Sequence, residues 1–126
     1  MLKQEKRFFA DTAWGASRLS SCSVPKGALI IKNKQILAYG FNRKIIKTKK
    51  YEISAIYDAI FSSRKNDLTS AVLFSTCFPD LDDMKLIISC GIITVYFFGE
   101  IMDPHSVEIA NNAAQESIKL ELIKLN

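Results

Sequence analysis

The sequence predicts an α/β fold: a three-layer α/β/α sandwich built on a mixed sheet of about five strands. Apolar runs with strand-like composition occur at residues 27–31, 35–41, 71–76 and 92–98. The first two runs are adjacent, whereas the later ones alternate with stretches of helical periodicity. Strands separated by helices pair in parallel through right-handed crossovers, and the helices then cover both faces of the sheet.

The first half of the chain is predicted to contain a helix, a hairpin and a second helix. Residues 2–20 carry apolar side chains at approximately helical spacing, which predicts one helix with a broad apolar face. The polar turn 32–34 joins the first two strands as a hairpin. Residues 51–63 are predicted to be helical, because their apolar side chains recur at intervals of three and four positions.

The second half of the chain alternates strands with helices. Pro79 suits the start of a helix, where its missing N–H costs little, and Gly91 suits the end of the same helix. A further helix is predicted over 104–119, and a last edge strand over 121–125. Three carboxylates that are favourable against the helix dipole fall in the first turn after Pro79: Asp80, Asp82 and Asp83.

Composition narrows the class of protein. With 48% apolar and 24% charged residues, the 126-residue chain is typical of a globular protein with one core, so we expect a single domain over 1–126. The cysteines Cys22, Cys77 and Cys90 form no C-x-x-C pair, which predicts free thiols. The sequence shows neither a signal peptide nor the ~20 apolar residues that span a bilayer, so we expect a cytoplasmic protein without membrane contact.

Two segments resemble the metal-site motifs of a known family. They are Lys50-Tyr51-Glu52-Ile53-Ser54-Ala55-Ile56 and Pro79-Asp80-Leu81-Asp82-Asp83. They are similar to His-Ala-Glu-x-Asn-Ala-Ile and Pro-Cys-x-x-Cys, the signature of zinc-dependent cytidine and deoxycytidylate deaminases. Weaker similarities before, between and after these motifs extend the resemblance over roughly residues 8–98. The resemblance implies a cytidine-deaminase-like fold.

All three zinc ligands of that signature are replaced. The His position is Lys50, and the Cys positions are Asp80 and Asp83. Zinc prefers imidazole nitrogen and thiolate sulfur, and a protonated lysine has no lone pair with which to bind it. We therefore expect neither a metal nor another cofactor. The family's glutamate, here Glu52, shuttles protons beside a zinc-bound water; without that water we expect a vestigial Glu52, which caps a helix or contacts a base edge.

The three replacements leave two arrangements open. In the first, the ammonium group of Lys50 lies between the carboxylates of Asp80 and Asp83, and this ion-pair cluster takes the place of the metal and its thiolates. In the second, the two aspartates only cap their helix, and Lys50 points into water. The sequence does not decide between these arrangements.

Residues for binding a nucleotide are expected beside the same site. By the resemblance, Asn42 occupies the position that contacts the nucleoside sugar. The following segment, 43–50, holds five cations in eight residues, and Arg43, Lys44 and Lys47 are candidates for contact with a phosphate. Such cations would bind a nucleotide or the backbone of a single-stranded nucleic acid. Alternatively, the segment is a solvated loop.

The function predicted from the sequence is binding rather than catalysis. We interpret the chain as a deoxycytidylate-deaminase-like pseudoenzyme that binds a nucleotide, a single-stranded nucleic acid or a protein partner, as a homo-oligomer or a hetero-oligomer. One alternative is an active pyrimidine nucleotide deaminase, acting on dCMP, with an unusual metal site. Another is a structural subunit of a larger complex that uses the fold only as a surface.

Overall fold

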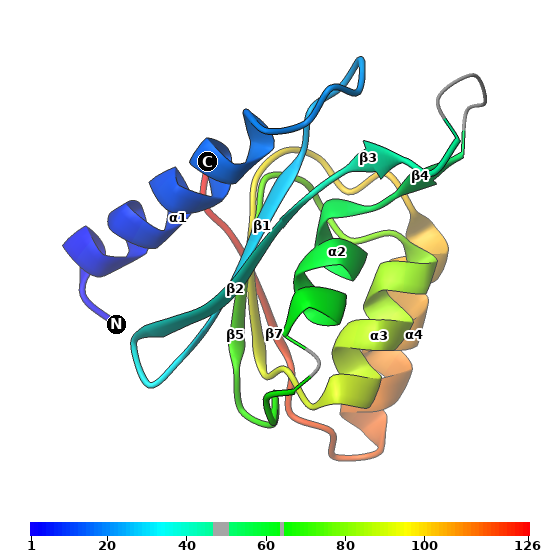
Figure 1. The fold of residues 1–126 in the computed structure, drawn as a ribbon. Coiled ribbons are helices and arrows are strands. Elements are labelled where there is room, and N and C mark those ends of the chain that lie inside the picture. Colours follow the sequence, from blue (N-terminus) through cyan, green and yellow to red (C-terminus); the bar gives the residue numbers. More distant parts are fainter. Residues whose placement is uncertain (47–50, 64) are drawn as a thin grey trace.

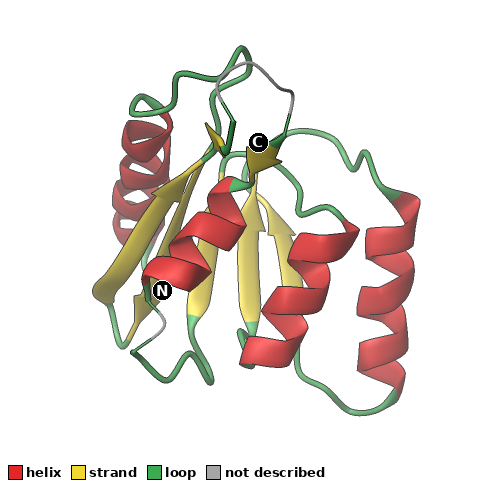
Figure 2. Cartoon of the chain, turned by 45° about the vertical axis from the view of Figure 1, so that its right-hand side comes forward, coloured by secondary structure: helices red, strands yellow, loops and turns green. Residues whose placement is uncertain are grey.

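The computed structural model describes residues 1–46, 51–63 and 65–126, which form a sheet with helices on both sides (Figures 1 and 2). The helices in these residues are α1 (Lys3–Ser17), α2 (Ala55–Ser62), α3 (Leu81–Cys90) and α4 (Pro104–Gln115). The strands are β1 (Gly27–Lys32), β2 (Gln35–Phe41), β3 (Arg43–Lys44), β4 (Glu52–Ile53), β5 (Val72–Ser75), β6 (Thr94–Phe97) and β7 (Glu121–Lys124). None of the described helices combines the length and the apolar character needed to cross a membrane.

The main sheet is mixed and has five strands, in the order β2-β1-β5-β6-β7. Strand β1 is antiparallel to both of its neighbours, β2 and β5, whereas β5, β6 and β7 run parallel to one another. The crossovers between the parallel strands contain α3 and α4. The predicted mixed sheet of about five strands is therefore confirmed. The alternation of strands and helices did not predict the antiparallel pairing of β1 with β5.

Two apolar clusters divide the core into the two sides of a three-layer sandwich. On one face of the sheet, α2, α3 and α4 pack against β1, β5 and β6 (Figure 2), with Ile56, Met84 and Ile87 among the buried side chains. On the other face, α1 lies against the sheet through Phe9 and Ala13. The three-layer α/β/α architecture predicted from the sequence is thus confirmed.

Two glycines allow helices to approach the sheet closely. A Cβ at Gly40 in β2 would lie 2.3 Å from the backbone nitrogen of Ala59 in α2. A Cβ at Gly27 in β1 would lie 2.1 Å from the carbonyl oxygen of Ala13 in α1. Because backbone atoms cannot move aside as a flexible side chain can, these positions fix how α1 and α2 sit on the sheet.

The structure departs from the predicted elements near the two family motifs. Helix α2 begins at Ala55 rather than at residue 51, because residues 52–53 pair with 43–44 as a separate two-stranded ribbon, β3–β4. Helix α3 begins at Leu81, with Asp80 as its N-cap, rather than at Pro79. The helix ends as predicted at Gly91, which adopts φ +80.

Candidate functional site

A hollow of about 180 Å³ lies where both helices of the family motifs begin. It is bordered by the start of β1, the end of β2, strand β4, the N-termini of α2 and α3, and the turn after β5. The lining residues are Lys26, Asn42, Glu52, Ser54, Ala55, Ile56, Cys77, Phe78, Asp80 and Asp83. The fold therefore brings together Asn42, Glu52 and both aspartates, which the sequence analysis placed at one site.

The N-termini of α2 and α3 are joined by side chains. Ser54 caps α2, because its Oγ accepts a hydrogen bond from the Tyr57 amide at 2.9 Å. The same hydroxyl donates to Oδ1 of Asp83 in α3 at 2.6 Å. Asp80 caps α3, since its Oδ1 accepts from the Asp83 amide at 2.8 Å. The two positions that would carry metal-binding cysteines thus hold carboxylates that organise the helix starts.

Burial controls the ionisation of two groups in this hollow. The side chain of Asp83 is only 6% exposed, and its removal from water raises its pKa from 3.8 to about 6. The hydrogen bond from Ser54 opposes this rise, and the nearby charge of Asp80 adds to it. Burial also raises the pKa of the Cys77 thiol, although the charge of Lys26 opposes that shift. The thiol is therefore protonated at neutral pH and is a poor nucleophile or metal ligand.

Asn42 forms part of the wall of the hollow and is 2% exposed. Its Oδ1 accepts from the Lys26 amide at 2.8 Å, and its Nδ2 donates to the Val24 carbonyl at 2.9 Å. A longer contact of 3.4 Å joins Nδ2 to Oε2 of Glu52. Asn42 therefore holds the segment before β1 against the end of β2, and it aligns Glu52 at the opening.

The candidate phosphate-binding residues do not all face this hollow. Nε and one terminal nitrogen of the Arg43 guanidinium bond Oδ1 of Asp58, at 3.3 and 2.8 Å, and Arg43 borders a different hollow beside β2. Lys44 is exposed on β3. Lys47 and Lys50 lie outside the described residues, so the proposed cluster of Lys50 with the aspartates stays a prediction.

Sequence reasoning missed two site residues. Lys26 lines the hollow, and its charge acts on Cys77 together with the charges of Asp80 and Asp83. A charged residue directly before a buried strand was the available signal. Ser54 was also missed as a bridge, because its bond to Asp83 joins residues that are 29 positions apart.

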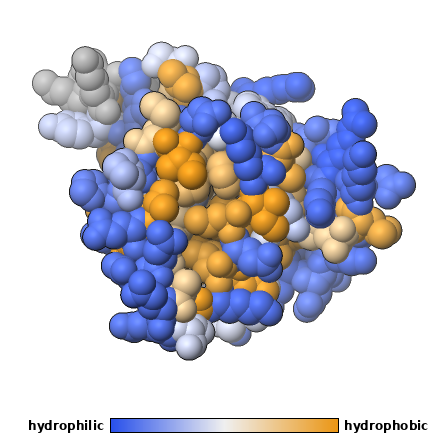
Figure 3. All heavy atoms as spheres, turned by 180° about the vertical axis from the view of Figure 1, so that it is seen from behind, coloured by the Kyte–Doolittle hydropathy of each residue, from blue (hydrophilic) through white to orange (hydrophobic). Residues whose placement is uncertain are grey.

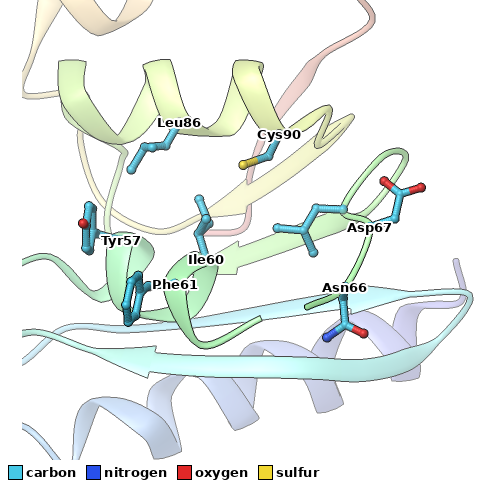
Figure 4. A pocket seen from close by; sticks show the side chains of 8 residues that line it. Tyr57, Ile60, Phe61, Asn66, Asp67, Leu86 and Cys90 are labelled. Carbon is cyan, nitrogen blue, oxygen red and sulfur yellow. The ribbon is translucent and has the colours of Figure 1, made fainter. Parts of the chain in front are cut away.

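A much larger apolar groove, of about 400 Å³, lies between α2 and α3 (Figure 4). Ile60, Leu86 and Cys90 point into it, and the rings of Tyr57 and Phe61 close one end. It contains none of the site residues predicted from the sequence. We place the candidate site at the smaller hollow, because it joins Asn42 and Glu52 to both aspartates of the family motif.

The donor atoms of the smaller hollow do not fit zinc. Within residues 1–46, 51–63 and 65–126, no three His, Cys, Asp or Glu side chains are grouped so that they could hold a metal ion. Oδ1 of Asp80 and Oδ1 of Asp83 already accept hydrogen bonds from the protein. Structural and catalytic zinc sites instead use deprotonated Cys, neutral His or charged carboxylates in a tetrahedral set.

Comparisons with known proteins agree with the fold. The model of the cytidine and deoxycytidylate deaminase zinc-binding region matches residues 3–99. Among solved structures, the apo dCMP deaminase from cyanophage S-TIM5 matches with a TM-score of 0.83 at 24% identity, over 99% of this chain and 100% of that chain. A tRNA:A34 deaminase matches with a TM-score of 0.69 at 16% identity, over 96% of this chain and 99% of that chain. No curated protein sequence matches.

For another similar structure, the match spans only part of a larger enzyme. The diaminohydroxyphosphoribosylaminopyrimidine deaminase/5-amino-6-(5-phosphoribosylamino)uracil reductase from Thermotoga maritima matches with a TM-score of 0.70 at 26% identity, over 96% of this chain and 36% of that chain. Proteins that share this fold are thus named for different substrates. Since the family model spans most of the chain, including both motif segments, this chain belongs to the cytidine and deoxycytidylate deaminase family.

Proposed function

We propose that this protein binds a pyrimidine nucleotide in the hollow at the starts of α2 and α3 and does not deaminate it. The observation that carries the proposal is the Ser54–Asp83 hydrogen bond, which engages a side chain at a metal-ligand position of the family signature. Asn42 and Glu52, which the signature and the resemblance assign to the pocket, still line the hollow. The cyanophage S-TIM5 dCMP deaminase, which matches with a TM-score of 0.83, has a structure in complex with dCMP and dUMP, and this supports a pyrimidine ligand.

We expect no deamination because the described part of the hollow offers no group that activates a water molecule as zinc does. Deamination by this family requires a water activated by zinc, which lowers the pKa of the bound water far below that of bulk water. The described residues of the hollow offer carboxylates, an amide, a hydroxyl, an ammonium and a protonated thiol. None of these groups stabilises hydroxide as a divalent cation does. Glu52 alone would have to take a proton from ordinary water.

The polar groups of the hollow can bind a nucleotide base through hydrogen bonds without reacting with it. A cavity of about 180 Å³ holds the volume of about six waters, which suits one small planar ring rather than a whole nucleotide. Glu52 accepts hydrogen bonds from ring N–H or amino groups, and Lys26 donates to carbonyl oxygens. The sugar and phosphate would then lie outside the hollow.

Association with a second chain is a further part of the proposal. Apolar side chains gather at the centre of the face seen from behind (Figure 3), and Phe98, Ile123 and Leu125 are only partly buried against the α1 cluster. The stacked rings of Tyr57 and Phe61 are also about half exposed. Apolar side chains that gather on the surface in this way favour association with a second chain. The structural-subunit alternative uses the same surface.

An ammonia-release assay tests the absence of chemistry. The purified protein is incubated with dCMP, with and without added zinc, and compared with Glu52→Gln and with Glu116→Gln, an exposed control. We expect no ammonia above the no-protein background in any sample. Zinc-dependent release that Glu52→Gln abolishes and Glu116→Gln leaves intact would show that the protein is an active deaminase.

A further inference from the structure

The two faces of the main sheet are covered unequally. Helices α2, α3 and α4 lie on one face, whereas α1 is the only described helix on the other (Figure 1). Helix α1 packs mainly against β1, β2 and β5, which are three of the five strands. In the described structure, the part of this face formed by β6 and β7 therefore has no helix above it.

Apolar side chains line this uncovered part of the sheet. Tyr96 on β6 and Ile123 on β7 are register partners, and Phe98 and Leu125 follow two positions later on the same face. All four belong to the α1 cluster, but Phe98, Ile123 and Leu125 are only partly buried. We call these four residues the β6–β7 strip. In the view from behind, apolar side chains gather between hydrophilic borders (Figure 3).

The strip has the width of one helix. Neighbouring strands lie about 4.8 Å apart, so two strands span about 10 Å, close to the diameter of an α-helix with its side chains. Helix α1 rises above the sheet by about its own diameter, so the strip is the floor of a trough with α1 as one wall. A flat bilayer does not reach such a floor, whereas a helix laid beside α1 covers it.

The flank of α1 beside the strip is basic. The rings of Trp14 and Phe98 meet at 5.4 Å between centroids, and the Lys6 ammonium lies 5.7 Å from the Tyr96 centroid. Trp14 and Lys6 therefore mark the flank of α1 that faces the strip. Helical spacing of three or four positions from these two residues, or from each other, adds three cations to that flank: Lys3, Arg7 and Arg18.

The chain does not neutralise these four cations. The ion pairs of the described residues include none of them. Glu121, which lies on β7 at the far border of the strip, pairs with none of them either. On the opposite flank of α1, by contrast, Glu5 pairs with Lys34 at 3.1 Å. Unpaired cations beside an apolar floor favour a ligand that is apolar on one face and acidic along one border.

We propose that the β6–β7 strip binds an amphipathic helix of a partner protein, whose apolar face covers the strip and whose acidic residues face the basic flank of α1. A second copy of this chain fits less well, because each of its described helices already packs its apolar face on its own sheet. A single-stranded nucleic acid also fits less well, since Tyr96 is 7% exposed and Lys6 lies over its ring. The inference rests on the association with a second chain proposed above, not on nucleotide binding.

The single tryptophan of the chain, Trp14, reports on the strip directly. It is 40% exposed, so a helix seated beside it should shift its emission to shorter wavelength. The probe is a stapled, Trp-free peptide of about 15 residues, about 22 Å long, with Leu on one face and Glu along its borders. Matched peptides carry Lys in place of Glu, or the same residues in an order without an apolar face. We expect a saturable shift with the Leu-Glu peptide alone.

Charge reversal on the flank tests the preference for acidic residues. We expect Lys3→Glu combined with Arg7→Glu to weaken binding of the Leu-Glu peptide by about tenfold or more, because attractions become repulsions. Lys65→Glu combined with Lys85→Glu changes the net charge equally, at exposed positions away from the strip, and should have little effect. Circular dichroism checks that both double variants fold. If the first does not, the comparison of the Glu and Lys peptides decides.

Several outcomes would overturn the proposal. They are equal shifts with the Glu and Lys peptides, no shift with any peptide, a larger shift with anionic phosphatidylserine vesicles or a single-stranded oligonucleotide, and a shift that grows with protein concentration alone. Light scattering separates this inference from the association on which it rests. An oligomer that does not respond to the Leu-Glu peptide contradicts only the inference, whereas a monomer that binds no peptide contradicts both.

Discussion

The Ser54 hydroxyl donates a 2.6 Å hydrogen bond to Oδ1 of Asp83 and so ties the start of α2 to the start of α3. In the family signature, the position of Asp83 belongs to a metal-binding cysteine. Here Asp83 instead accepts a hydrogen bond that joins the N-terminus of α2 to the N-terminus of α3. The same Ser54 oxygen caps α2 by accepting from the Tyr57 amide, so one side chain supports both the helix and the contact between helices.

Replacement of Ser54 should therefore cost more than the loss of an ordinary helix cap. Ser54→Ala removes the cap and leaves a buried carboxylate without its hydroxyl donor, and we expect the free energy of unfolding to fall by about 2 to 3 kcal/mol. Ser62→Ala, at the exposed end of the same helix, is the control and should change little. Urea denaturation of both variants checks the difference. Equal effects would show that the bridge contributes nothing to stability.

The raised pKa of Asp83 makes stability depend on pH with a definite sign. Its pKa is about 6 in the folded chain against an ordinary 3.8, so the folded chain holds this proton more tightly. The proton on Asp83 therefore stabilises the folded chain fully below about pH 4, and this stabilisation is lost as pH rises to about 6. The free energy of unfolding is then about 3 kcal/mol lower above pH 6 than below pH 4.

Asp83→Asn tests this sign, because the amide oxygen still accepts from Ser54 but carries no charge. We expect the variant to be more stable than the parent at pH 7.5, by up to about 3 kcal/mol, and to lack the decline between pH 4 and 6. Thermal and urea unfolding across this range provide the measurement. A loss of stability at pH 7.5 would instead indicate a charged partner for Asp83, as the predicted cluster with Lys50 requires.

Asp58 serves both Arg43 and the Phe41 amide, and two variants separate these roles. Asp58→Asn keeps an acceptor for the amide and removes the ion pair, whereas Asp58→Ala removes both. We expect losses of about 1 kcal/mol for Asn and about 2 kcal/mol for Ala, since Arg43 is half exposed and its pairing is partly screened. Chemical denaturation in low and high salt measures the two contributions. If the order of the two variants were reversed, the assigned roles would be wrong.

Alanine substitution should change stability in opposite directions at two glycines, because a Cβ has no room at Gly40 and ample room at Gly15. A Cβ at Gly40 would lie 2.3 Å from backbone in α2, so Gly40→Ala should destabilise the protein by about 3 kcal/mol or more. A Cβ at Gly15 in α1 meets nothing within 4 Å, and Gly15→Ala should stabilise by about 1 kcal/mol through helix propensity. Melting temperatures of the two variants give the comparison. A tolerated Gly40→Ala would contradict the packing described.

Local patterns predicted most of the fold because each element depends on its own spacing of apolar residues. The helices, the hairpin and the parallel strands were confirmed on that basis. The β3–β4 ribbon was not predicted, because its second strand falls in the range 51–63 that was predicted to be helical. The antiparallel pairing of β1 with β5 was not predicted, since strand neighbours are chosen by contacts distant in sequence. The contacts of Arg43 with Asp58 and of Ser54 with Asp83 were missed for the same reason. No periodicity encodes which side chain faces another across two elements.

We expect the family's pocket to bind a pyrimidine nucleotide without zinc. Isothermal titration of dCMP into protein treated with EDTA tests it most directly, with Glu52→Gln as the site variant and Glu116→Gln as the exposed control. We expect saturable binding by the EDTA-treated protein, weakened by Glu52→Gln, retained by Glu116→Gln and unchanged when zinc is restored. Binding that appears only after zinc is added, or no binding in either condition, would contradict it.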